Sequence, residues 1–270
     1  LAGVGLLTVL ALVDDRQNPV YQAAVTKSDR EASRVRVLAQ SPSGIPPQGA
    51  VSLLRNDPYT QGPRLFAAHC AGCHRYDGHN GLGDEIKDEP SASDLKGFGS
   101  RQWLSGFFDP QQIATHKFFG GTAFKDGKMA SFVTKEVASY ELEQQRLLEK
   151  VITTLSAEAA LFSQRDLDQR DEIIIQEGHE LFGNDGLMCL DCHQFHGEGP
   201  SRPRGPELTG YGSRDWIMGI MHDPTQVKYY GKRNDGMPAF GREGRLDPNQ
   251  IGLIADWLRG DWLVDKAAVP

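Results

Sequence analysis

The chain has 270 residues, a formal net charge of −7 at pH 7 and 39% hydrophobic residues. This length suits one large domain or two domains of ordinary size. The acidic balance argues against a nucleic-acid-binding protein, because such proteins need basic surfaces that meet phosphate groups. It fits a folded protein whose partner carries a basic surface.

The first residues, 1–13, form an unbroken run of apolar and small side chains that ends at Asp14 and Asp15. As a helix this run is about 20 Å long, whereas the apolar core of a bilayer is about 30 Å thick. It is either the end of a transmembrane helix or the remains of a signal sequence. No small-residue cleavage pattern precedes Asp14, so we favour the transmembrane helix. Both interpretations place the rest of the chain outside the cytoplasm.

Residues 14–55 are assigned to a helical segment and a linker. Residues 14 to about 40 are polar with scattered apolar positions, and we expect them to be helical. The stretch 41–49 is rich in Pro, Gly and Ser, which predicts an extended, semi-rigid linker. Its expected role is to hold the following part of the chain away from the membrane; the alternative is a loop that lies on the domain surface.

The pattern Cys-x-x-Cys-His occurs at 70–74 and again at 189–193, and it accounts for all four cysteines of the chain. It is the attachment pattern of c-type haem, in which two thiols add to the porphyrin vinyl groups and the adjacent imidazole binds the iron. The alternatives are one zinc site or two redox dithiols, but neither needs the histidines. The pattern therefore predicts two haem c groups, held by Cys70, Cys73 and His74, and by Cys189, Cys192 and His193. Haem attachment also requires an exported chain.

The sequence repeats itself around these two motifs, which indicates an internal duplication. Similar segments occur in the same order in both halves. The matching pairs are 62–66 and 178–182, 95–103 and 208–216, and 126–132 and 235–240. We therefore assign two tandem units, residues 56–157 and 158–270.

Each unit is expected to end in a helix. In the second unit, Asp247 and Pro248 suit the start of a helix whose apolar residues are Ile251, Ile254, Ala255 and Leu258. In the first unit, Leu148, Val151, Ile152 and Leu155 have the same spacing within a longer helix from about Thr134. Residues 163–170 are polar and read as a hinge between the units. Strand patterns are scarce, so the predicted fold class is mainly α.

Met129 and Met237 are the predicted second axial ligands of the two irons. Each follows an Asp-Gly pair at a matching place in its unit, on a loop that can reach across to an iron. A thioether ligand leaves no open site on the iron and favours an electron carrier. The alternatives are that both methionines fill gaps in the core, or that His116 replaces Met129. The other methionines, Met188, Met218 and Met221, are interpreted as core residues or weaker rivals.

Other residues are expected to tune or line the two sites. The carbonyl of Pro206 is expected to accept a hydrogen bond from the ring N–H of His193. Ser93 in the first unit is not expected to reproduce this geometry. The two haems are therefore expected to differ in redox potential. Arg101 and Arg214 are either donors to haem propionates or solvent-facing neighbours of core tryptophans. The remaining histidines, His69, His79, His179, His196 and His222, are assigned to the surface or the haem edges. The repeated apolar residues Leu65, Phe66, Leu95, Leu181, Phe182 and Leu208 are expected to line the haem crevices.

Each unit resembles a class I cytochrome c domain over about 56–157 and 170–265, with its haem motif, glycine-rich loop, distal methionine and closing helix. The segments 44–47, 62–70 and 119–129 add a narrower resemblance, to the dihaem cytochrome c extension fused to bacterial cytochrome b or subunit IV-type proteins. This resemblance implies a quinol-oxidising bc complex on the periplasmic side of the membrane. It implies cytochrome b and a Rieske iron–sulfur protein as partners, and a downstream cytochrome or oxidase as acceptor.

The leading hypothesis is therefore an electron-transfer subunit that is not an enzyme on its own. One alternative is a dihaem peroxidase, which would need one iron to open its distal side. Another is a membrane-anchored dihaem carrier that feeds a terminal oxidase.

Overall fold

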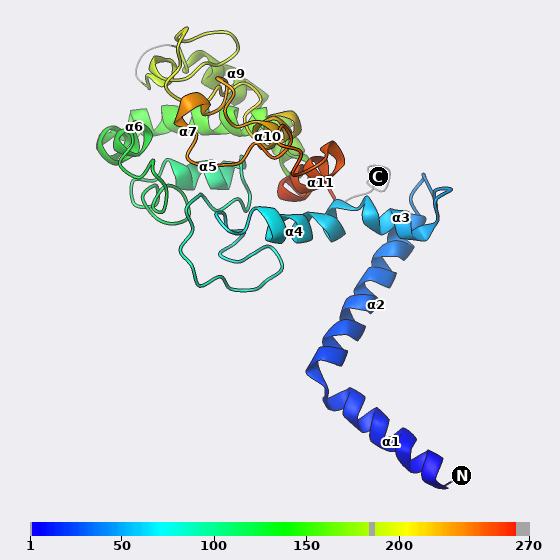
Figure 1. The fold of residues 1–270 in the computed structure, drawn as a ribbon. Helices are drawn as coiled ribbons and strands as arrows, with labels where there is room; N and C mark the ends of the chain where they lie inside the picture. Colours follow the sequence, from blue (N-terminus) through cyan, green and yellow to red (C-terminus); the bar gives the residue numbers. More distant parts are fainter. Residues whose placement is uncertain (1, 184–186, 263–270) are drawn as a thin grey trace.

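The computed structural model describes residues 2–183 and 187–262, and this part of the chain is mainly helical, as predicted (Figure 1). In the described ranges no β-strand occurs, only isolated bridges such as Tyr76 to His79. The α-helices are α1 (Ala2–Gln17), α2 (Pro19–Ala39), α3 (Ala50–Arg55), α4 (Pro58–His69), α5 (Arg101–Phe107), α6 (Lys128–Ser131), α7 (Leu142–Glu158), α8 (Arg165–Arg170), α9 (Glu172–Glu180), α10 (Arg214–His222) and α11 (Pro248–Arg259).

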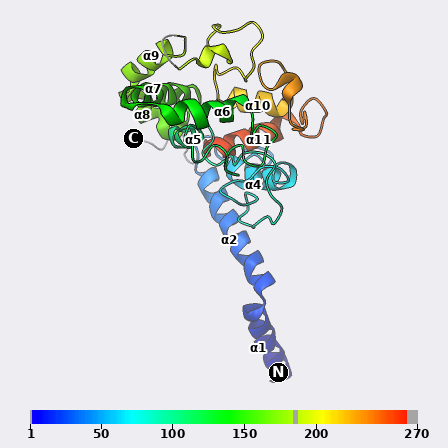
Figure 2. The same cartoon turned by 90° about the vertical axis from the view of Figure 1, so that its left-hand side faces the viewer.

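Helices α1 and α2 form an arm that extends away from the other helices (Figures 1 and 2). The arm bends at Asn18, whose side chain accepts hydrogen bonds from the amides of Val20 and Tyr21 and so caps α2. The apolar side chains of α1 are exposed, and the helix continues through Asp14 and Asp15. Among residues 2–183 and 187–262, no helix is both long and apolar enough to cross a bilayer. Leu1, at the start of the predicted transmembrane segment, lies outside the described residues.

The base of the arm is fixed to the start of α4. Arg34 donates two hydrogen bonds to the buried carboxylate of Asp57, at 2.7 and 3.1 Å, and a third to the carbonyl of Trp262. Asp57 also caps α4 by accepting from the amide of Thr60. Between α2 and α3, where a linker was expected, the chain forms turns closed by hydrogen bonds from the amide of Gly44 to the carbonyl of Ser41 and from that of Gly49 to the carbonyl of Pro46.

The closing helices differ in how well their starts were predicted. α11 begins after Asp247, with Pro248 in its first turn, as expected. α7 begins at Leu142, not near Thr134, because the chain first forms a π-helical turn and a 3₁₀ turn and then becomes extended at Tyr140. The expected hinge at 163–170 is instead a 3₁₀ turn followed by α8, and Gln164 is buried there against Ser156.

The helices that flank the two Cys-x-x-Cys-His motifs pack crosswise between the two repeats. α4, which precedes the first motif, packs on α11, which closes the second repeat. α9, which precedes the second motif, packs on α7, which closes the first repeat. The views in Figures 1 and 2 show α4 beside α11. The short connection through α8 favours the pairing of α7 with α9, because helices joined by short connections are usually neighbours.

Two glycines allow these close helix contacts. A Cβ atom at Gly62 in α4 would lie 2.2 Å from Cβ of Trp257 in α11. A Cβ atom at Gly178 in α9 would lie 2.1 Å from Oγ1 of Thr154 in α7. Both distances are far below van der Waals contact, so each helix pair depends on the missing side chain.

The buried side chains form two hydrophobic clusters, and each draws on both repeats. Core A joins residues around the first motif to the last part of the chain. Its buried members are Phe66, Ala71, Trp216, Ile217, Ile220, Met221, Tyr229, Phe240, Leu246, Ile251, Ile254, Ala255, Trp257 and Leu258. Core B joins the middle of the chain to residues around the second motif. Its buried members are Trp103, Leu104, Phe108, Ile113, Phe118, Ala130, Val133, Val137, Tyr140, Leu148, Val151, Ile152, Leu155, Phe182, Leu187, Phe195 and Leu208.

The tandem units 56–157 and 158–270 therefore describe the repeats of the sequence, whereas the two cores cross the boundary between them. The helix exchange explains this difference, because each core needs the N-terminal helix of one repeat and the C-terminal helix of the other.

We predict that Gly62→Ala destabilises the fold by about 1–3 kcal/mol, the usual cost of forcing an extra atom into a packed helix contact. Chemical denaturation followed by circular dichroism measures the change. The matched control is Gly5→Ala, since a Cβ atom at Gly5 meets nothing within 4 Å. Equal stability of Gly62→Ala and the parent chain would contradict the α4–α11 contact.

Candidate functional site

The first Cys-x-x-Cys-His motif forms one turn of chain at the end of α4. Cys70 is the C-terminal cap of α4, and its carbonyl accepts from the amides of Cys73 at 3.1 Å and His74 at 2.9 Å. This turn holds the two thiols and the imidazole together. Burial, with a smaller effect of Cys73, raises the pKa of the Cys70 thiol to about 12, so the thiol is protonated at neutral pH.

The second motif forms the same turn in core B. The carbonyl of Cys189 accepts from the amides of Cys192 at 3.3 Å and His193 at 3.0 Å. Burial raises the pKa of the Cys189 thiol to about 11. All four cysteines are free thiols, so each motif keeps the groups that covalent haem attachment requires.

The two motif histidines are held in the same orientation. Nδ1 of His74 lies 2.7 Å from the carbonyl oxygen of Ser93, and Nδ1 of His193 lies 2.7 Å from that of Pro206. An Nδ1–H that donates to a carbonyl fixes the tautomer and leaves Nε2 free for a metal. Burial lowers the pKa of both imidazoles, which favours the neutral form that binds iron.

This geometry corrects one expectation. Ser93 does reproduce the contact predicted only for Pro206, because the acceptor is a backbone carbonyl that any residue can supply. The expected difference in potential between the two haems therefore loses the reason given for it.

The two predicted methionine ligands lie in opposite cores from the motifs of their own repeats. Met237 packs against core A, as does Cys70 of the first motif. Met129 packs against core B, as does Cys189 of the second motif. The sequence pattern suggested ligands paired within each repeat, and the structure differs because the flanking helices are exchanged.

The rival ligands have contacts of their own. Met221 is buried in core A, and Met218 packs against core A while its sulfur accepts from Arg214 at 3.0 Å. Met188, next to Cys189, is 57% exposed. His116 is exposed and lies 3.6 Å from the carboxylate of Glu89.

Arg101 and Arg214, the expected propionate donors, both form ion pairs within the chain. Arg101 forms ion pairs with Asp168, at 2.7 Å, and with Asp171. Arg214 donates to both carboxylate oxygens of Asp256, at 2.6 and 3.1 Å. The two arginines therefore tie α5 to the α8–α9 region and α10 to α11, which the sequence could not show.

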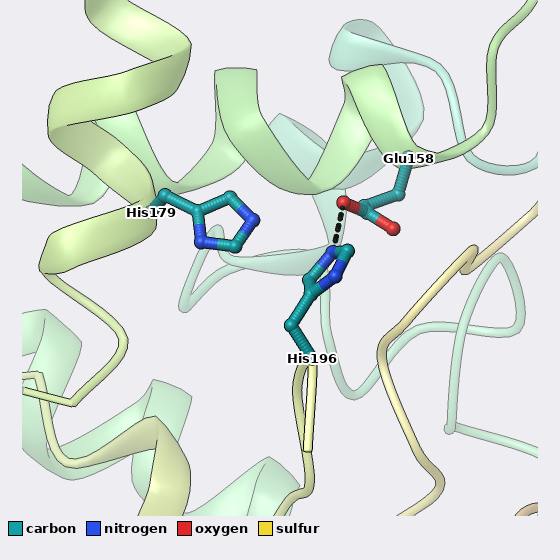
Figure 3. A group of neighbouring side chains, drawn as sticks. All are labelled: Glu158, His179 and His196. Atoms are coloured by element: carbon teal, nitrogen blue, oxygen red, sulfur yellow. Dashed lines mark hydrogen bonds and ion pairs between the residues drawn. The ribbon is translucent and has the colours of Figure 1, made fainter. Parts of the chain in front are cut away.

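A third group of side chains was not recognised from the sequence as a group. Nε2 of His196 lies 2.7 Å from a carboxylate oxygen of Glu158, which accepts its hydrogen bond, and the ring centroids of His179 and His196 lie 4.5 Å apart (Figure 3). The ligand atoms of these three residues lie within 4.8 Å of one another, a set that could hold a divalent ion. Glu158 also accepts from the amide of Gly210. The group links α7, α9 and the loop after the second motif, and it forms only because α9 packs on α7.

The structure also contains an open pocket of about 750 Å³ beside the first motif. Its lining combines the charged side chains of Arg75, Asp94, Lys96 and Lys117 with apolar ones such as Trp103, and it includes the alternative ligand His116.

Comparisons of this chain with protein-family models, with curated proteins and with solved structures found no match.

We predict that acid weakens the group around His179. Burial, with a smaller effect of His196, lowers the pKa of His179 below its ordinary value of 6.5, against the opposing effect of Glu158 and Glu198. The unfolded chain therefore takes up a proton below about pH 6.5 that folded His179 resists, and stability falls as the pH falls. Unfolding measured between pH 7 and 5 checks this. His179→Gln is expected to lose less stability over the same range than the parent, and an equal loss would contradict the assignment.

Proposed function

We propose that the chain binds two haem c groups and carries electrons. The observation that carries this proposal is that both motifs form the same turn, each with free thiols and with an imidazole whose Nδ1 lies 2.7 Å from a carbonyl oxygen. A zinc site needs the four thiols close together, but Cys70 and Cys189 lie in different cores. A redox dithiol has no use for the two oriented imidazoles.

When bound, the haem supplies a one-electron couple on the iron. The chain supplies the rest. The thiols would form the thioether links, and the carbonyls of Ser93 and Pro206 orient His74 and His193 so that Nε2 would be available to an iron. The apolar cores would keep water away from the group, and a methionine sulfur as the second ligand would leave no open position for a substrate. This arrangement favours electron transfer over peroxide chemistry.

At a finer level, we propose that the chain is the periplasmic cytochrome c part of a quinol:cytochrome c reductase. Its donor would be a Rieske iron–sulfur protein beside cytochrome b, and its acceptor a downstream cytochrome or oxidase. The resemblance of the sequence to dihaem cytochrome c extensions supports this placement. So does the arm of α1 and α2, whose apolar first helix is exposed and whose base is bound to α4 through Arg34 and Asp57.

The first test is the haem content of the exported chain, produced in cells that attach haem c. We expect two covalently bound haems per chain, measured as pyridine haemochrome and by haem stain after denaturing electrophoresis. Cys70→Ser with Cys73→Ser is expected to leave one haem, and so is Cys189→Ser with Cys192→Ser. Bound zinc in place of iron would contradict the proposal. So would haem that is released on denaturation, because such haem is not covalently attached.

A second test concerns the finer placement. The haem-loaded chain, mixed with a reduced Rieske protein, is expected to be reduced rapidly, as followed by its visible absorption. Rapid consumption of peroxide by the reduced chain would instead favour the peroxidase alternative.

A further inference from the structure

The exchange of helices bears on which methionine binds which iron. We propose that the haem attached at Cys70 and Cys73 is bound on its far side by Met237, and the haem attached at Cys189 and Cys192 by Met129. This inference rests on the proposed function, because it assumes two haems. Each haem would then be held by both repeats, with an imidazole from one and a thioether from the other.

The contacts of core A place the first motif against the end of the chain. Phe66, one turn before Cys70, lies 5.4 Å from Trp257, measured between ring centroids. Tyr76, just after His74, stacks on the same tryptophan at 4.2 Å. His69, which precedes Cys70, lies 6.4 Å from Phe240, three residues after Met237.

The contacts of core B repeat this arrangement for the second motif. Cys189, Leu190 and Met129 all pack against core B, whose members include Phe182 and Val151. Tyr140, which lies after Met129 in the first repeat, is 9% exposed and belongs to the same core. The second motif therefore shares its surroundings with the methionine loop of the first repeat.

The methionine loops are anchored in these positions by buried neighbours. Ala130 is 3% exposed and Val133 is fully buried, and both belong to core B. Ala239 is 2% exposed, Phe240 belongs to core A, and Asn234 donates to the carbonyl of Met237 at 2.8 Å. Pairing within each repeat would require both loops to leave their cores.

The two methionine loops contact each other, so pairing of each methionine with the motif of its own repeat is the alternative to be tested. Phe124 stacks on Tyr230 at 5.6 Å between ring centroids, and Asp235 accepts from the amide of Ala123 at 3.0 Å. Both contacts lie before the methionines in sequence. Because the two loops are neighbours, the experiment must distinguish the crossed pairing from pairing within each repeat.

The test combines single-haem chains with single methionine changes. In the chain with Cys70→Ser and Cys73→Ser, only the haem at the second motif remains. We expect Met129→Ala to make its reduced iron bind carbon monoxide and to remove the methionine–iron charge-transfer band of the oxidised form, while Met237→Ala leaves both properties unchanged. In the chain with Cys189→Ser and Cys192→Ser, the two methionine variants should exchange their effects.

The crossed pairing is overturned if carbon monoxide binds a haem after substitution of the methionine of its own repeat. It is also overturned if either substitution has this effect, or if neither has. Met188→Ala is the matched control, because this methionine is 57% exposed and packs in neither core. A single-haem parent chain without covalent haem at its intact motif would instead count against the proposed function, so the two failures are distinguishable.

A second set of variants covers the case in which loss of a whole haem prevents folding. Cys73→Ser or Cys192→Ser alone leaves one thioether link and one free vinyl group, which shifts the absorption of that haem to longer wavelength. The shift marks one haem in a chain that keeps both. Carbon monoxide is then expected to bind the marked Cys192→Ser haem after Met129→Ala, and the marked Cys73→Ser haem after Met237→Ala. The reverse assignment overturns the proposal.

Discussion

The contact between α4 and α11, and its counterpart between α7 and α9, is the constraint on which the rest of the structure depends. Both contacts require a glycine where a side chain would collide with the facing helix, at Gly62 and at Gly178. Because each Cys-x-x-Cys-His motif lies C-terminal to one helix of such a pair, α4 or α9, the contact also places each motif in the core against which the other repeat's methionine packs.

The exchange has the form of an approximate two-fold relation between the repeats. Matching residues meet across it: Phe98 lies 5.2 Å from Tyr211, and a Cβ atom on Gly99 would touch the Cα of Gly212. Buried Arg259 in α11 donates to the carbonyls of Ala159 and Ala160, just after α7, and to that of Gly212. An isologous contact of this kind is usual between two subunits, and here it joins two repeats of one chain.

Much of the architecture was predictable, because it follows from local patterns. The two motifs, the duplication, the mainly helical class and the capped start of α11 at Asp247 all have short-range signals. The helix exchange has none. Gly62 and Phe66 in one repeat match Gly178 and Phe182 in the other, so the sequence specifies a type of helix contact without specifying the partner. The contact between His74 and the carbonyl of Ser93 was not predicted, because every residue has a backbone carbonyl and the residue type does not indicate which one is used.

The crossed cores also affect how the chain can be made. α4 is synthesised well before α11, the helix that packs on it, because the two helices lie far apart in the sequence. Until α11 is synthesised, no helix packs on α4, and the apolar side chains around the first motif are exposed to water. Contacts between segments far apart in the sequence form slowly, and until they form the apolar surface is exposed and prone to aggregation. Under the proposed function, the same delay would leave the thiols of Cys70 and Cys73 accessible for haem attachment before core A closes over them.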